Sequence, residues 1–405
     1  MAHSIEIRGR LILALVEAAV AGRDLPQLVE TVCAALVEAG VPLARASMGA
    51  LLLHPVLNAT LVIWRRGRGA MVEDTARPVV PGEEPWRQSP FYRLLTTGEH
   101  VLRRRLERGE GADELALLAG LAAEGGTDYL ALRLRLGEAV TLGEADDLFS
   151  SWVSDRPGGF ADEHIALIRE LEPLAAFVFA STLNRTTAKA LLATYLGADA
   201  AARVLGGAIE RGRAEPIEAV IWYSDLEDFT RLTDSLPREQ LLDLLNAYAE
   251  AQVDAIEAAG GQILKFMGDG ILATFQGAEA CDACAAALSA WAEARRTTAA
   301  LSEARMRRGE PVTRPYLALH TGEVLYGNIG GKARLDFTVL GPAVNETARI
   351  AALCRSLGQQ AVLSEAFAES CGPWRERLVG LGRYALRGVA RPQVLFTLEP
   401  EAQLP

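Results

Sequence analysis

Cysteine, long uncharged apolar runs and lysine are all scarce in this 405-residue sequence. The five cysteines include one C-x-x-C pair, Cys281 and Cys284, and no second pair follows to complete a zinc site or a disulfide scaffold. We therefore expect this pair to pack within a helix, in a protein of the reducing cytoplasm. No uncharged stretch reaches the roughly 18 residues of a membrane span. The short apolar run before Glu17 predicts an amphipathic helix, and we expect no membrane span.

Basic residues are outnumbered, which gives a formal net charge of -11. Broad nucleic-acid binding requires a basic surface that neutralises phosphates, so we expect no nucleic-acid partner, and any phosphate site must be built locally. Among the 41 basic residues the lysines are Lys189, Lys265 and Lys332. A lysine at a given position is therefore an unusual choice in this chain.

The first 180 residues alternate between helical and strand patterns. Leucine-rich periodicity predicts helices over 5–40, and apolar runs predict strands at 47–53, 59–64, 129–136 and 148–153, with helical patterns over 90–124 and 161–196. This order resembles a GAF-type sensory domain over 1–182, although another small α/β regulatory domain fits as well. The resemblance implies a regulatory role and a small-molecule or other signal that the sequence does not identify.

The last of these helices carries an apolar seam at Ile168, Leu171, Ala175 and Val178. The 3-4-3 spacing fits a parallel coiled coil, and it fits a helix packed on its own domain equally well. Residues 183–216, which are rich in glycine toward their end, are expected to form a helical linker between two domains.

A different pattern begins at Ile217. Strand patterns at 219–224, 262–275 (a hairpin), 315–320, 323–327 and 335–340 are interleaved with helical patterns at 237–259, 278–306 and 342–357. The order β-α-β-β-α-β predicts a ferredoxin-like palm with additions over 217–405. We therefore expect an α+β protein with a regulatory domain in front of this palm.

Two carboxylates stand at turns of the predicted palm. Asp225 ends the first strand and Asp269 lies at the turn of the central hairpin, in Met267-Gly-Asp-Gly270. In a palm these two places are neighbours, so the carboxylates would repel each other unless a cation bridged them. Magnesium prefers such oxygen ligands. The pair therefore predicts a divalent-metal site.

Four segments in order, 220–230, 264–275, 320–330 and 337–350, resemble the catalytic domain of class III adenylate cyclases. The resemblance implies that Asp225 and Asp269 bind two divalent ions, Mg²⁺ or Mn²⁺, with the carbonyl of Leu226. It also implies that backbone amides around Phe229 and Thr230 hold a triphosphate. Asp228 departs from the glycine that commonly precedes Phe-Thr in the family, which leaves the detail of this loop open.

The same resemblance assigns the remaining residues of the site. Lys265 and Thr338 match the purine-selecting pair, and a lysine donor with a threonine acceptor favours adenine over guanine. A threonine at this position, where many other relatives have an aspartate, resembles the pattern of the class IIIb subgroup. Asn345 and Arg349 match the pair that stabilises the transition state, and their spacing places them on one helix face. Arg387 falls where the family often has a phosphate-binding lysine.

Together these matches imply conversion of ATP to 3′,5′-cyclic AMP and pyrophosphate. In the family the metal aspartates come from one subunit and the Asn-Arg pair from the other, so a homodimer with two equivalent sites is expected. A catalytically weak nucleotide-binding regulatory module is one alternative. A guanylate cyclase is another, and Lys265 argues against it. A diguanylate cyclase should show a Gly-Gly-Asp/Glu-Glu-Phe hairpin, which the sequence around Asp269 does not fit.

Overall fold

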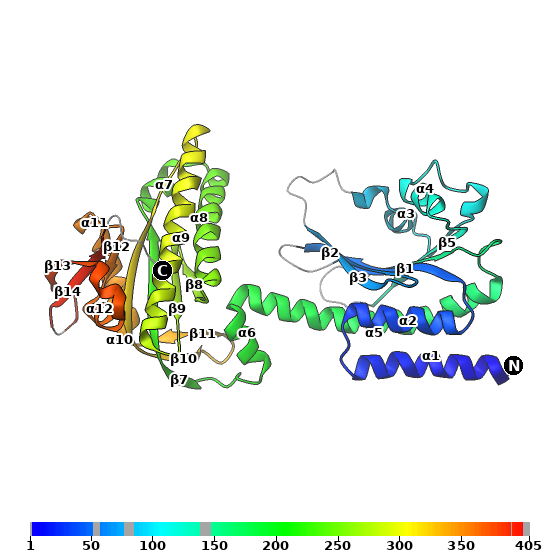
Figure 1. Ribbon diagram of the computed structural model, residues 1–405, viewed down its shortest axis with the longest axis horizontal. Coiled ribbons are helices and arrows are strands. Elements are labelled where there is room, and N and C mark those ends of the chain that lie inside the picture. The colour runs from blue at the N-terminus through cyan, green and yellow to red at the C-terminus, as the bar shows by residue number, and fades with distance from the viewer. Residues whose placement is uncertain (1, 52–56, 77–84, 138–146, 390, 400–405) are drawn as a thin grey trace. The chain divides into compact units, whose positions relative to one another are not determined.

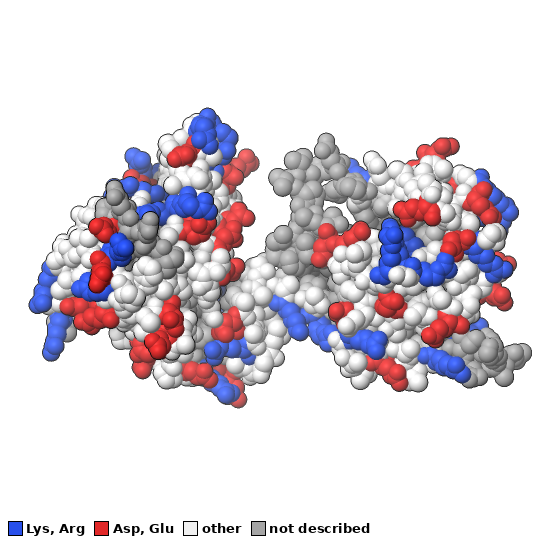
Figure 2. Space-filling view, viewed as in Figure 1, with Lys and Arg blue, Asp and Glu red and all other residues white. Residues whose placement is uncertain are grey.

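The computed structural model describes residues 2–51, 57–76, 85–137, 147–389 and 391–399. The chain divides into two compact units, Met1–Leu191 and Leu192–Pro405, and each is described by itself. Among the described residues, no helix is both long enough and apolar enough to cross a membrane. Figure 2 shows acidic and basic side chains interspersed over the visible face of each unit.

The N-terminal unit is built on a six-stranded antiparallel sheet. Its strands lie in the order β3-β2-β1-β6-β5-β4. Their bounds are β1 Leu43–Leu51, β2 Leu57–Arg65, β3 Gly69–Ala76, β4 Val101–Arg104, β5 Asp128–Arg135 and β6 Asp147–Ser154. The two central strands, β1 and β6, are therefore distant in sequence. The sheet is complete only when β6, late in the unit, pairs with β1, early in the unit.

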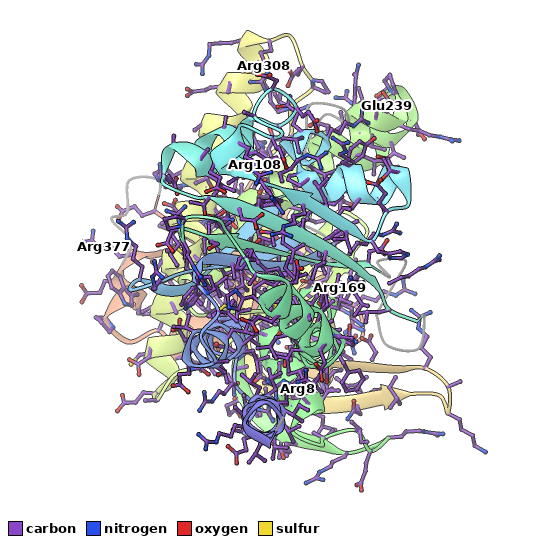
Figure 3. All side chains as sticks on the ribbon, turned by 90° about the vertical axis from the view of Figure 1, so that its right-hand side faces the viewer. Arg8, Arg108, Arg169, Glu239, Arg308 and Arg377 are labelled. Atoms are coloured by element: carbon purple, nitrogen blue, oxygen red, sulfur yellow. The ribbon has the colours of Figure 1, made fainter. Side chains whose placement is uncertain are left out.

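Helices cover both faces of this sheet (Figure 1). On one face lie α1 Ala2–Val20, α2 Leu25–Glu38 and α5 Asp162–Leu196, and on the other lie α3 Pro90–Thr97 and α4 Ala116–Ala123 with the short 3-10 turns η1 Pro85–Gln88 and η2 Leu106–Arg108. Figure 3 views the unit nearly along α1 and α5, where Arg8 and Arg169 are labelled. Arg8 pairs with Glu170 at 3.2 Å, which ties α1 to α5.

The seam of α5 packs within its own unit. Ile168, Leu171 and Ala175 belong to the main core with Trp64 and Trp152. Val178 is buried against α1 and α2 through Ala18 and Leu28. Of the two interpretations of the 3-4-3 spacing, packing on the helix's own domain is the one that the structure has.

The prediction of a helical region over 90–124 is wrong in part. β4 lies inside it and pairs with β5. Arg103 on β4 donates to the buried carboxylate of Asp128 at 2.7 Å, and that carboxylate also accepts from the Phe160 amide at 3.0 Å. The strand is fixed by this distant ion pair and by its ladder, which local periodicity does not reveal.

The C-terminal unit contains an eight-stranded sheet in the order β13-β14-β12-β10-β7-β9-β8, with β11 paired to β10. The strands are β7 Ala214–Leu226, β8 Gln262–Met267, β9 Gly270–Phe275, β10 Pro315–Gly330, β11 Leu335–Leu340, β12 Ala361–Leu363, β13 Leu378–Tyr384 and β14 Gln393–Leu398. The helices are α6 Ala198–Leu205, α7 Phe229–Ser235, α8 Arg238–Ala258, α9 Ala280–Arg307, α10 Pro342–Ala351, α11 Cys354–Leu357 and α12 Glu365–Ser370, with the 3-10 turn η3 Gly372–Arg377.

The four strands β10-β7-β9-β8 form the expected palm. All three pairings are antiparallel, and α8 and α9 provide the two crossovers of the β-α-β-β-α-β order. α8 and α9 pack on one face around Trp222, Phe275 and Trp291. α10 packs on the opposite face, through Ala343 and Ile350. The protein is thus a mixed helix-and-sheet protein, as the sequence predicts.

The predicted strands 315–320 and 323–327 are one continuous strand, β10. It pairs with β7 from Pro315 to Gly327, and it pairs with β11 from Leu325 to Gly330. Thr321-Gly-Glu323 suggests a break in the sequence, but Gly322 lies opposite Ala219 within the ladder. β10 therefore joins the end of the palm near Asp225 to the hairpin that carries Thr338.

Candidate active site

The two aspartates meet at one end of the palm. Asp225 stands near the end of β7, and Asp269 lies in the turn between β8 and β9. Because β7 pairs with β9 up to the Ser224–Ile271 position, the strand end and the hairpin turn are adjacent. The backbone N–H of Leu226 donates to both carboxylates, at 3.2 Å to Asp225 and 3.1 Å to Asp269.

This closeness is costly for the charged forms. Burial, followed by the hydrogen bond and the negative charge of Asp269, raises the pKa of Asp225 from 3.8 to about 7, although the Leu226 amide acts in the opposite direction. A cation between the carboxylates would reverse this cost, and the chemistry of the pair fits a hard divalent ion. Within the described part of the chain, no group of three or more His, Cys, Asp or Glu side chains is arranged around a metal position. An ion here would need further oxygen ligands from the backbone, water or substrate.

A cavity of about 570 Å³ opens beside the pair. Five of the predicted site residues line it: Asp225, Leu226, Phe229, Thr230 and Asp269. Tyr316 from β10 and the end of α10 complete its walls together with Asp228, Arg231, Asp234 and Arg355. The structure therefore brings the predicted metal ligands and the predicted phosphate loop to one cavity.

Asp228 has the left-handed backbone conformation that its place in the loop requires. Its φ is 56°, and no other non-glycine residue among those described has a positive φ. Aspartate tolerates this region better than most side chains, which explains how it replaces the expected glycine. Its carboxylate forms an ion pair with Arg355 at 2.8 Å and lies 4.0 Å from Arg231.

Lys265 on β8 and Thr338 on β11 are related through Asp336 at a second place in the unit. The Lys265 ammonium donates to Asp336 at 2.9 Å. Thr338 follows Asp336 by two positions on β11, so the side chains of Asp336 and Thr338 point to the same face of that strand. Thr338 is buried, and its hydroxyl oxygen finds no hydrogen-bond partner among the described residues. A buried oxygen without a partner suits the polar edge of a ligand.

α10 carries Asn345 and Arg349 on the face opposite the sheet. Asn345 is exposed, and Arg349 is half-buried. The Arg349 guanidinium lies against Gly388, 3.4 Å from the position that a Cβ there would take, so it is next to Arg387. None of these polar residues lines the cavity of the aspartates, and neither does Lys265 or Thr338. One chain thus presents two sets of predicted site residues, those that line this cavity and those that do not.

His320 on β10 helps to hold α10 in place. Its Nδ1 lies 2.8 Å from the Ser364 hydroxyl, and its Nε2 lies 3.6 Å from Glu346 of α10, which also accepts from Gln393 at 2.9 Å. Burial lowers the pKa of this histidine. These contacts make it a structural residue that positions the helix bearing Asn345.

Sequence reasoning missed Arg355 and Tyr316 as cavity residues. Arg355 lies within the predicted helix 342–357, but in the structure α10 ends at Ala351 and Arg355 stands on α11. Tyr316 donates to Glu227, which Arg314 also holds. The place of Tyr316 at the cavity follows from the pairing of β10 with β7, which local sequence patterns do not show.

No family model matches the sequence. The chain is similar to adenylate cyclase 1 of Rhizobium meliloti, with 27% identity over 161 residues, which is 38% of this chain and 23% of that protein. It is similar to an adenylate cyclase of Anabaena cylindrica, with 29% identity over 157 residues, or 39% and 31% of the two chains. The chain contains a class III cyclase domain.

The cyclase domain also has relatives without an assigned activity. An uncharacterized protein of Mycobacterium tuberculosis is 29% identical over 213 residues, which is 50% of this chain and 35% of that protein. The chain thus spans about a third or less of the length of these relatives. Among solved structures, the adenylyl cyclase CyaB from P. aeruginosa covers 48% of this chain and 99% of its own, at 23% identity and a TM-score of 0.43. The guanylyl cyclase Cya2 covers 47% and 98%, at 27% identity and a TM-score of 0.41.

Proposed function

We propose that this protein is an adenylate cyclase that converts ATP to 3′,5′-cyclic AMP and pyrophosphate. The observation that carries the proposal is the pairing of Asp225 and Asp269 at one cavity, with the raised pKa of Asp225. Such a pair is poorly placed for a purely structural role, because burial and mutual repulsion oppose its ionisation. It suits a site where a cation and a polyphosphate arrive together.

The residues of the cavity have distinct tasks in this proposal. Asp225, Asp269 and the Leu226 carbonyl hold the metal ions, and backbone amides around Phe229 and Thr230 bind the triphosphate. Two divalent ions per site, Mg²⁺ or Mn²⁺, would neutralise phosphate charge and assist attack of the ribose 3′ oxygen on the α-phosphate.

Adenine selection is assigned to Lys265 and Thr338. The lysine can donate only, which suits the unprotonated ring nitrogen of adenine, and the threonine oxygen can accept from the exocyclic amine. Guanine presents a carbonyl and an N–H at these positions. The partnerless Thr338 oxygen supports a ligand here, and Lys265 must exchange its contact with Asp336 for the base.

A second copy of the chain supplies the remaining groups. Asn345, Arg349 and Arg387 lie outside the cavity of the aspartates within one chain, which favours a homodimer whose sites combine the two groups. Asn345 would orient the ribose, and Arg349 and Arg387 would bind phosphate oxygens. The GAF-like N-terminal unit would regulate this assembly in response to an unidentified signal in the cytoplasm. The free cysteines fit that compartment.

The test is an assay of purified protein with ATP or GTP and Mg²⁺ or Mn²⁺, with products identified by mass spectrometry. We expect cyclic AMP from the wild type and from Asp254→Ala, a control at an exposed site on α8. Asp225→Ala should lose at least about a hundredfold in rate while melting cooperatively. Nucleotide binding without product would favour a regulatory module, and a preference for GTP would favour a guanylate cyclase.

A further inference from the structure

Cations are scarce in the cavity of the aspartates. Among the described residues, its charged lining consists of four carboxylates and two guanidinium groups: Asp225, Asp228, Asp234, Asp269, Arg231 and Arg355. A triphosphate in this cavity must therefore find positive charge beyond the metal ions. The state of the two arginines then decides how readily a polyanion binds.

Both arginines are directed at the same carboxylate. Arg355 contacts Asp228 at 2.8 Å, whereas Arg231 is more distant at 4.0 Å. The Arg355 side chain is 72% exposed, so water screens its ion pair and little holds the guanidinium in place. Its backbone is well anchored, because the neighbouring Cys354 is buried and its thiol donates to the Leu317 carbonyl at 3.4 Å. Arg355 thus has a guanidinium that is free to move and a backbone that is held in place at the cavity wall.

The charge of Asp228 is not needed for the shape of the loop. The left-handed conformation is open to asparagine and glycine as well, so the turn itself does not select a carboxylate. The carboxylate also makes no hydrogen bond to the start of α7. Its partners in the described structure are the two arginines.

We propose that Arg355 binds the triphosphate in this cavity and that Asp228 is an internal counterion which the triphosphate displaces. The inference rests on the proposed function and adds to it a phosphate ligand from the same chain as the metal aspartates. A guanidinium can give two parallel hydrogen bonds to phosphate oxygens, which an exposed ion pair does not outweigh. Asp228 therefore lowers the affinity for substrate and excludes weaker anions from Arg355.

The experiment measures binding of inorganic tripolyphosphate with Mg²⁺ by calorimetry, beside KM and kcat for ATP. Arg355→Ala should weaken tripolyphosphate binding and raise KM about tenfold, with kcat nearly unchanged, because the contact exists in both the ground and transition states. Arg355→Lys should recover part of the binding. Asp228→Asn keeps the backbone conformation and should tighten binding about threefold. Arg308→Ala, at an exposed residue at the end of α9 paired with Glu310, is the matched control.

The double variant decides whether the two residues act together. In the Arg355→Ala background, Asp228→Asn should have a clearly smaller effect on binding than in the wild type, because only the repulsion by one negative charge is then removed. An equal effect in both backgrounds, unchanged binding by Arg355→Ala, or no tripolyphosphate binding by the wild type would overturn the inference. Arg355-dependent binding without cyclic AMP formation would refute the proposed function alone. Cyclic AMP formation with an unchanged KM in Arg355→Ala would refute the inference alone.

Discussion

Glu172 is a buried acid of the N-terminal unit, and it makes stability depend on pH. It lies on α5, 8% exposed, and accepts a hydrogen bond from the Ser150 hydroxyl at 3.0 Å. Ser150 in turn accepts from the indole N–H of Trp152 at 3.1 Å. Burial raises the pKa of Glu172 from 4.5 to about 7, although the Ser150 contact and Arg169 act in the opposite direction.

The sign of the effect follows from proton uptake. The folded state keeps its proton at a higher pH than the unfolded state, so protonation stabilises the fold fully below about pH 4.5. This contribution is lost as pH rises through about 7. The shift corresponds to about 3 kcal/mol of unfolding free energy across this window.

Glu172→Gln should remove this dependence, because the amide oxygen can still accept from Ser150 without ionising. At pH 8 we expect the variant to be more stable than the wild type by up to about 3 kcal/mol, and at pH 5 by less than about 1 kcal/mol. Urea unfolding, with hydrogen exchange of α5 peptides to isolate the N-terminal unit, measures both values. Glu170→Gln is the control, since it breaks only the exposed pair with Arg8. Parallel pH profiles for wild type and Glu172→Gln would refute the burial argument.

Three further predictions concern the cyclase domain. Thr338→Val should leave thermal stability equal or higher, by up to about 1 kcal/mol, because it removes a buried hydroxyl that has no partner, while ATP turnover falls; a lower melting temperature would contradict this. Lys265→Glu should lower kcat/KM for ATP relative to GTP, and an unchanged ratio would remove Lys265 from base selection. Mixing inactive Asp225→Ala and Arg349→Ala subunits should restore about a quarter of wild-type activity, since half the randomly paired dimers hold one intact site; no recovery, with exchange verified by differently tagged subunits, would place the whole site in one chain.

Sequence periodicity predicts the long helix of the N-terminal unit and the hairpin of the palm. The long helix was predicted over 161–196 and runs from Asp162 to Leu196, and the palm hairpin was predicted over 262–275. β4 was not predictable in this way, because its four residues are held by Arg103 and Asp128 across a gap in sequence. The continuity of β10 was equally hidden, since its glycine reads as a break until its partners on β7 are known.

For the candidate site, the residue types predicted the aspartate pair because both aspartates end local elements whose order was clear. The sequence could not show that Asp228 adopts a left-handed conformation, or that it contacts Arg355, since that contact joins the start of α7 to α11, more than a hundred residues away in the chain. The assignment of Lys265, Asn345 and Arg349 to one catalytic centre stays a prediction, because within one chain they do not line the cavity of the aspartates.

The long ladder between β7 and β10 also sets an order for biosynthesis. Tyr316, which lines the cavity, and its hydrogen-bond partner Glu227 are 89 residues apart in the sequence. As the chain leaves the ribosome, β7 and the β8-β9 hairpin emerge first and can pair, but β7 keeps one open edge until residues 315–330 follow. An open edge of this kind can pair with another nascent chain. Translation of α9, the helix that precedes β10, is therefore an interval in which the open edge of β7 needs protection, and slowing synthesis there should increase aggregation more than slowing it after β10.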